Sequence, residues 1–84
     1  MYRIEVSRTA HQQMRRLSEQ TEDRVNKAIA QLGGNPRPLG SKKLTDRDGY
    51  RIRVGDYRVF YQIGDTAKLV IIYRVAARSD VYRF

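Results

Sequence analysis

The part of the sequence that most constrains the fold is Tyr50–Tyr61, where two alternating segments flank a Gly-Asp pair. Alternation of apolar and polar residues is the period of a half-buried strand. A Gly-Asp pair suits a two-residue turn with glycine at a position that needs positive φ. Such a turn fixes the register, so that Arg53 faces Arg58 and Arg51 faces Phe60. The stretch therefore predicts an antiparallel β-hairpin with one apolar face and one arginine-rich face.

The arginine-rich face carries Arg51, Arg53, Arg58 and Phe60, and it contains no acidic residue. Like charges directly opposite each other on paired strands destabilise the pair, by up to ~1 kcal/mol. The solvated face of an ordinary hairpin is the simpler explanation, but three arginines around one aromatic ring on a basic chain favour an anion site. Guanidinium groups hold phosphate bidentately, and an aromatic ring can stack on a base. This face is thus predicted to bind phosphate, although arginine is a poor general base because its pKa lies above ~12.

The rest of the chain predicts a helix hairpin and further strands. The order β-α-α-β-β-β defines a small single α+β domain over residues 1–84, with the helix hairpin packed on one face of an antiparallel sheet. We expect the first strand to lie antiparallel beside the last strand or at the sheet's edge. Periodicity and capping residues predict a strand over 2–6, a helix after Thr9, a second helix after Ser18 or Thr21 that ends at Gly33-Gly34, and strands over 50–54, 57–63 and 68–75.

The net charge of the chain is +8, from 17 Lys and Arg against 9 Asp and Glu. Such a charge favours a polyanion, usually nucleic acid, or an acidic protein partner. Lys42, Lys43 and Arg47 precede the hairpin in a polar segment and extend the basic surface. With no cysteine and a single histidine, we expect no metal and no cofactor. No apolar run approaches the length of a membrane span, so we expect a cytoplasmic domain with no membrane partner.

Three stretches carry a family resemblance: the opening YRIEVS, the long segment PRPLGSKKLTDRDGYRIRVGDYRVFYQI and the closing RVAARSDVYRF. Together they resemble the RelE/ParE superfamily of toxins from bacterial and archaeal toxin–antitoxin pairs, over nearly the whole chain. The resemblance implies the same α+β fold. It also implies one of two activities, because RelE-like members cut mRNA in the decoding site of the ribosome, whereas ParE-like members inhibit DNA gyrase.

The resemblance to RelE implies catalytic roles for a defined set of residues. In the implied mechanism a nucleotide 2′-hydroxyl attacks its own 3′ phosphate, the arginines stabilise the charge, and the tyrosine orients or stacks on the substrate base. The family often has lysine at two of the arginine positions, and His or Lys where Ala77 stands, so this chain has no obvious general base. The matching residues are Arg51, Arg53, Arg58, Arg78 and Tyr82.

The expected function is a type II toxin that acts as a ribosome-dependent endoribonuclease on mRNA in the decoding site. Its expected partners are a cognate acidic antitoxin, the small-subunit ribosomal RNA and mRNA. Lys42, Lys43 and Arg47 would dock on ribosomal RNA, and Phe60 would contact nucleic acid. Two alternatives stay open: a ParE-type gyrase inhibitor without nuclease activity, and a non-enzymatic nucleic-acid-binding module.

Overall fold

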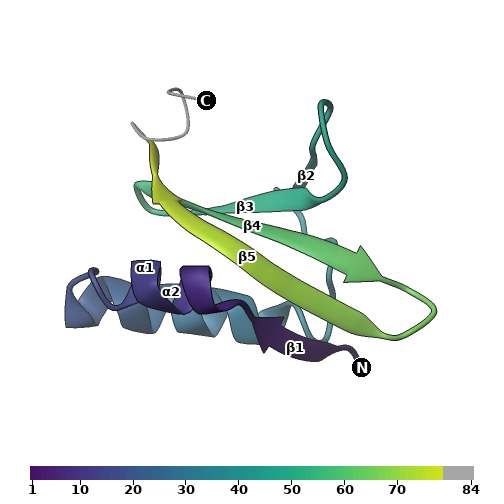
Figure 1. The fold of residues 1–84 in the computed structure, drawn as a ribbon, viewed down its shortest axis with the longest axis horizontal. Coiled ribbons are helices and arrows are strands. Elements are labelled where there is room, and N and C mark those ends of the chain that lie inside the picture. Colours follow the sequence, from purple (N-terminus) through teal and green to yellow (C-terminus); the bar gives the residue numbers. More distant parts are fainter. Residues whose placement is uncertain (79–84) are drawn as a thin grey trace.

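The computed structural model describes residues 1–78, which form a five-stranded sheet with two helices on one of its faces (Figure 1). The strand order is β1-β5-β4-β3-β2. The predicted order β-α-α-β-β-β is confirmed, with one additional short strand, β2, before the hairpin. The elements in chain order are β1 (Arg3–Val6), α1 (Arg8–Met14), α2 (Glu19–Gln31), β2 (Lys42–Lys43), β3 (Tyr50–Val54), β4 (Tyr57–Gly64) and β5 (Leu69–Ala77).

The first strand makes the sheet mixed rather than antiparallel throughout. β1 lies at the edge, as expected, but it pairs with β5 in parallel, and an antiparallel pairing is therefore wrong. The cause is the helix hairpin, which returns the chain to the start of β1: the N–H of Tyr2 donates to the carbonyl oxygen of Gly33 at 2.8 Å. The meander β3-β4-β5 then begins from that same end. Its first and last strands consequently run in the direction of β1.

Each helix begins at a serine whose side chain accepts a hydrogen bond from the first turn. Ser7 accepts from the N–H of Ala10 at 3.1 Å, and Ser18 accepts from the N–H of Thr21 at 3.2 Å. Ser18 is one of the two caps predicted for α2. For α1 the predicted cap Thr9 is wrong, because Ser7 has the extended backbone of a cap (φ −64°, ψ 160°) and Thr9 already lies within the helix. Each such cap stabilises its helix by roughly 0.5–2 kcal/mol.

The β3–β4 hairpin has the predicted register, with Arg53 opposite Arg58 and Arg51 opposite Phe60. Gly55 has the expected positive φ, at 61°. The apolar face of the hairpin packs against the helices, and the arginine-rich face is directed to the open side of the sheet. The core combines buried apolar residues from both layers: Ala10, Met14, Val25, Ile29, Leu32, Ile52, Val59, Tyr61, Val70, Ile72 and Val75.

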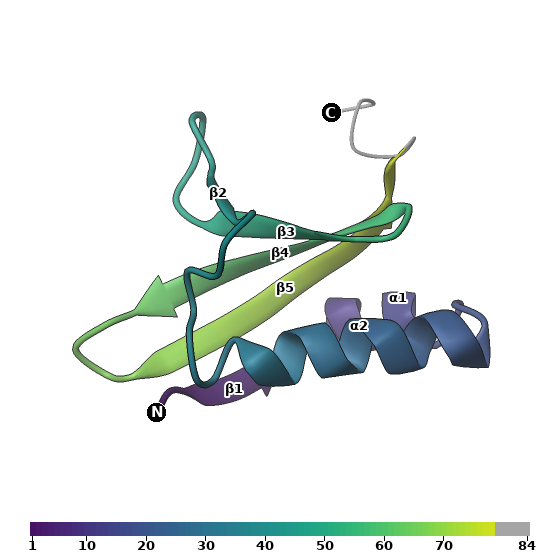
Figure 2. The ribbon, with the colours of Figure 1, turned by 180° about the vertical axis from the view of Figure 1, so that it is seen from behind.

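The connector between α2 and β2, residues 32–41, is tied to this core. Tyr61 is fully buried, and its hydroxyl donates to the carbonyl oxygen of Pro36 at 2.8 Å. Burial raises the pKa of Tyr61 to about 12, so the hydroxyl stays protonated and able to donate. Figure 2 shows the connector running from the end of α2 past the sheet to β2. The core therefore fixes the path of the connector that leads to β2.

A register shift interrupts the pairing of β4 with β5. Phe60 pairs with Arg74, but the next residue of β4, Tyr61, pairs with Ile72, so Tyr73 is an extra residue in β5. A bulge of this kind bends its strand and changes the direction of a side chain. As a result, both Tyr73 and Arg74 lie against Phe60: the two rings are 6.3 Å apart between centroids, and the Arg74 guanidinium carbon is 5.4 Å from the Phe60 centroid.

Candidate anion-binding site

The arginine-rich face of the hairpin forms one wall of a cavity of about 180 Å³. Arg51 and Arg53 line it from β3, and Arg58 lines it from β4. Lys42 of β2 and Gly40 of the connector line its other side. No acidic residue is among these lining residues, so the cavity is cationic. The structure thus brings together the three arginines that the hairpin register predicts to share a face.

Arg58 is the most unusual group in this cavity. The residue is only 8% exposed, and it is the one charged residue among the buried residues of the described chain. Its Nη1 is buried and has no hydrogen-bond partner within residues 1–78. A buried donor without a partner costs roughly 1–3 kcal/mol, and more for a charged group. A site that tolerates such a cost is suited to an external anion that supplies the missing acceptor.

The β3–β4 turn holds neighbouring arginines in place. The Nε of Arg53 donates to the carbonyl oxygen of Gly55 at 3.0 Å, which restricts this side chain beside the cavity. The backbone N–H of Arg78 donates to the carbonyl oxygen of Asp56 at 2.8 Å. Arg24 of α2 also lies against the turn, since a Cβ added to Gly55 would stand 3.3 Å from its Nη1. The turn therefore connects β3, the end of β5 and α2 at one end of the site.

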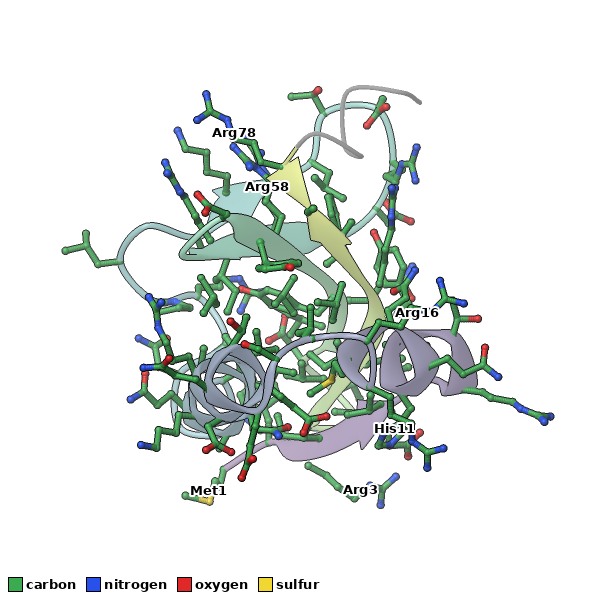
Figure 3. All side chains as sticks on the ribbon, turned by 90° about the vertical axis from the view of Figure 1, so that its left-hand side faces the viewer. Met1, Arg3, His11, Arg16, Arg58 and Arg78 are labelled. Atoms are coloured by element: carbon green, nitrogen blue, oxygen red, sulfur yellow. The ribbon has the colours of Figure 1, made fainter. Side chains whose placement is uncertain are left out.

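Arg78 is the one remaining predicted catalytic residue that the structure describes. Arg78 is exposed and is not among the cavity-lining residues, but Figure 3 shows it at the same end of the molecule as Arg58. Tyr82 lies outside the described residues. The backbone contact of Arg78 holds the end of β5 against the β3–β4 turn beside the cavity.

Phe60 is less accessible than a base-stacking role requires. The residue is 7% exposed, because Tyr73 and Arg74 cover its ring. Its contact with nucleic acid stays a prediction, and it would require Arg74 to move from the ring. The Tyr73 hydroxyl is buried with no partner among the described residues, and burial raises the pKa of Tyr73.

The basic residues predicted to dock on RNA are divided between two surfaces. Lys42 pairs with Arg51 and lines the cationic cavity, whereas Lys43 pairs with Tyr50 and lines a different hollow together with Arg37. Arg47 stands 3.8 Å from the carboxylate of Asp46. Sequence reasoning missed the position of Lys42 because β2 is only two residues long and shows no periodicity. The pairing of β2 with β3, which sets Lys42 opposite Arg51, is what places Lys42 at the cavity.

An ion-pair network lies at the other end of β4. Asp65 accepts two hydrogen bonds from the Arg37 guanidinium, at 2.9 and 3.2 Å, and one from the Tyr2 hydroxyl at 2.6 Å. These donors lower the pKa of Asp65 from its ordinary 3.8 to about 2. Arg37 also donates to the Tyr50 hydroxyl at 3.2 Å. The network joins the N-terminus, the connector, β3 and the β4–β5 turn, and it is structural rather than part of the cavity.

Residues 1–78 contain neither a cluster of metal ligands nor a membrane-spanning helix. No group of three or more His, Cys, Asp and Glu side chains there is arranged to hold a metal ion. Nor is any helix of this part long and apolar enough to cross a membrane.

The fold and the cavity define a small basic domain with a cationic cavity on the open face of its sheet, and known proteins share this architecture. The family described as ParE toxin of type II toxin-antitoxin system, parDE, matches residues 4–82. Toxin RelE of Mycobacterium tuberculosis is 36% identical over 84 residues, covering 98% of this chain and 87% of that protein. The chain belongs to this family of type II toxins.

Solved structures agree with this assignment. The archaeal RelE-RelB complex from Pyrococcus horikoshii OT3 superposes with a TM-score of 0.80 at 25% identity, covering 92% of this chain and 94% of that chain. The isolated E. coli RelE toxin superposes with a TM-score of 0.80 at 25% identity, covering 99% and 93% of the two chains. The resemblance to RelE/ParE toxins seen in the sequence is therefore confirmed.

Proposed function

We propose that this chain is a ribosome-dependent endoribonuclease that cleaves mRNA by attack of a nucleotide 2′-hydroxyl on the adjacent phosphate. The observation that carries the proposal is the buried Arg58, whose Nη1 lacks a partner in the described chain and which shares a cavity with Arg51 and Arg53. A phosphodiester would supply acceptors to this donor and to the two neighbouring guanidinium groups. Similarity to RelE toxins supports the same conclusion.

The proposed reaction fits what arginines can do. The 2′-oxygen bonds to phosphorus, the bond from phosphorus to the 5′-oxygen breaks, and the products are a 2′,3′-cyclic phosphate and a 5′-hydroxyl. Negative charge grows on the non-bridging oxygens in the transition state. Fixed cations in a partly desolvated site stabilise that charge without reorganising. Arg51, Arg53 and Arg58 would provide this stabilisation, with Arg78 acting from the end of β5 and Tyr82 on the base.

The size of the cavity supports a role for the ribosome. At about 180 Å³, the cavity is smaller than the ~300–1,000 Å³ of pockets that enclose a small-molecule ligand. It can accept a phosphate but cannot enclose the flanking nucleotides. The flanking nucleotides would therefore be held outside the cavity, a role that suits the decoding site. Lys43 and Arg47 would contact ribosomal RNA outside the cavity.

An antitoxin partner follows from the family. A relative from Pyrococcus horikoshii OT3 was crystallised as a complex of RelE with RelB. The net charge of +8 suits an acidic partner, whose carboxylates could occupy the arginine cavity and block substrate. Both proteins and the ribosome would meet in the cytoplasm.

The test is to map mRNA ends after brief induction of the protein and of Arg58→Ala. We expect new 5′ ends within coding regions for the wild type and a loss of at least ~100-fold for the variant, the effect of removing one oxyanion-stabilising donor. Arg3→Ala is the control, because Arg3 is an exposed arginine that lies away from Arg58 in Figure 3. Intact mRNA with a DNA-damage response would instead identify a gyrase inhibitor and refute the proposal.

A further inference from the structure

Among the described lining residues of the cationic cavity, Lys42 has the one side chain whose chemistry suits a general base. The described lining residues are three arginines, a lysine, a glycine and an isoleucine. Guanidinium does not lose its proton in proteins, so none of the arginines can act as the base. Lys42 carries an amine instead of a guanidinium, and lysine amines serve as general bases in enzymes. His11 lines a separate hollow on α1 and does not reach this cavity.

The sheet places Lys42 beside the arginines. Lys42 is the direct antiparallel partner of Arg51, and such partners have Cβ atoms about 4.5–5.5 Å apart on the same face. The charged groups around it are Arg51 and Arg53 from β3 and Arg58 from β4, and no carboxylate is among the lining residues that the structure describes. A phosphate bound by the arginines would therefore sit next to the lysine amine.

We propose that Lys42 accepts the proton of the attacking 2′-hydroxyl, an inference that rests on the endoribonuclease function proposed above. The neutral amine takes this proton as the 2′-oxygen bonds to phosphorus and the bond to the 5′-oxygen breaks. Water donates a proton to the leaving 5′-oxygen, and the ammonium returns its proton to solvent. Lys42 is thereby a catalytic residue in addition to the arginines, which bind and stabilise the phosphate.

The experiment compares Lys42→Arg with the wild type in single-turnover cleavage of mRNA bound to programmed ribosomes. Arginine keeps the positive charge but cannot act as a base. We expect the maximal single-turnover rate to fall at least ~100-fold, the lower range for losing a general base, while the half-saturating concentration changes by less than about threefold. Lys27→Arg, an exposed lysine on α2, is the matched control and should cleave like the wild type.

The pH profile and amine rescue separate a chemical role from a structural one. The rate of wild-type cleavage should rise with pH, as general-base catalysis requires, and Lys42→Arg should lose the part of that rise that depends on the lysine. In Lys42→Ala, added methylamine should restore part of the activity, which it cannot do for Lys42→Arg. Cleavage by Lys42→Arg at the wild-type rate and with the wild-type pH profile would overturn the role of Lys42 alone. Intact mRNA with the wild-type protein would overturn the endoribonuclease function as well.

Discussion

Replacing the buried Arg58 with methionine should stabilise the free protein while it destroys the site. Methionine is unbranched and can retain the packing of the arginine stem in the sheet. The change removes a buried Nη1 without a partner, which costs roughly 1–3 kcal/mol, and the like-charge pair with Arg53, which costs roughly 0.2–1 kcal/mol. We therefore expect the free energy of unfolding to rise by about 1–3 kcal/mol.

Urea unfolding and thermal melts measure this change. In a domain of this size each kcal/mol raises Tm by about 4–8 °C. Arg3→Met, at an exposed arginine paired with Glu5, is the control and should stay within about 0.5 kcal/mol of the wild type.

Inorganic phosphate adds a second readout. It should raise the Tm of the wild type by binding the folded state, and the Tm of Arg58→Met much less. If the free energy of unfolding of Arg58→Met is lower than that of the wild type by more than about 1 kcal/mol, the reasoning is refuted, because Arg58 then stabilises the free protein.

Two further predictions concern the framework around the site. Asp65 has a folded pKa of about 2, below its ordinary 3.8, so its stabilising contribution is present above pH ~4 and is lost as the pH falls toward 2. In thermal melts, the Tm of the wild type should thus fall more steeply with decreasing pH than the Tm of Asp65→Asn. Equal slopes of Tm against pH would contradict a stabilising role for the Asp65 network. Both Gly49 and Gly55 have positive φ, but only at Gly49 would a Cβ meet a backbone oxygen, that of Tyr61 at 2.8 Å. In urea unfolding we therefore expect Gly49→Ala to lower the free energy of unfolding by about 2–3 kcal/mol, and Gly55→Ala by about 1 kcal/mol. A larger destabilisation by Gly55→Ala than by Gly49→Ala would show that the steric contact at Gly49 is relieved in solution.

The hairpin could be predicted in detail because its determinants are local. The Gly55-Asp56 turn and the alternation on either side of it are read directly from neighbouring residues, and β3 and its register were correct. The same register predicts which residues line the cavity, since it places Arg51, Arg53 and Arg58 on one face. The prediction that Arg78 and Tyr82 also belong to the site came from the family resemblance.

The burial of the site could not be predicted, because it depends on contacts between distant segments. Alternation assigns Arg58 to an open face, yet the finished structure leaves it only 8% exposed. Phe60 was predicted to contact nucleic acid from the arginine-rich face, and nothing in the sequence indicated that the bulge at Tyr73 brings a second ring and Arg74 over it. A one-residue bulge has no reliable sequence signal in a strand of mostly apolar residues.

By itself, the sequence determined the strand and helix order, the hairpin register and the gathering of arginines, all of which depend on residues close together in the chain. Only the tertiary structure decided three features: the parallel pairing of β1, the burial of Arg58, and the position of Lys42 beside Arg51. Each depends on where a distant segment lies once the helices pack on the sheet. The arginines of the proposed phosphate site are thus encoded locally, while Lys42 reaches the cavity through long-range strand pairing.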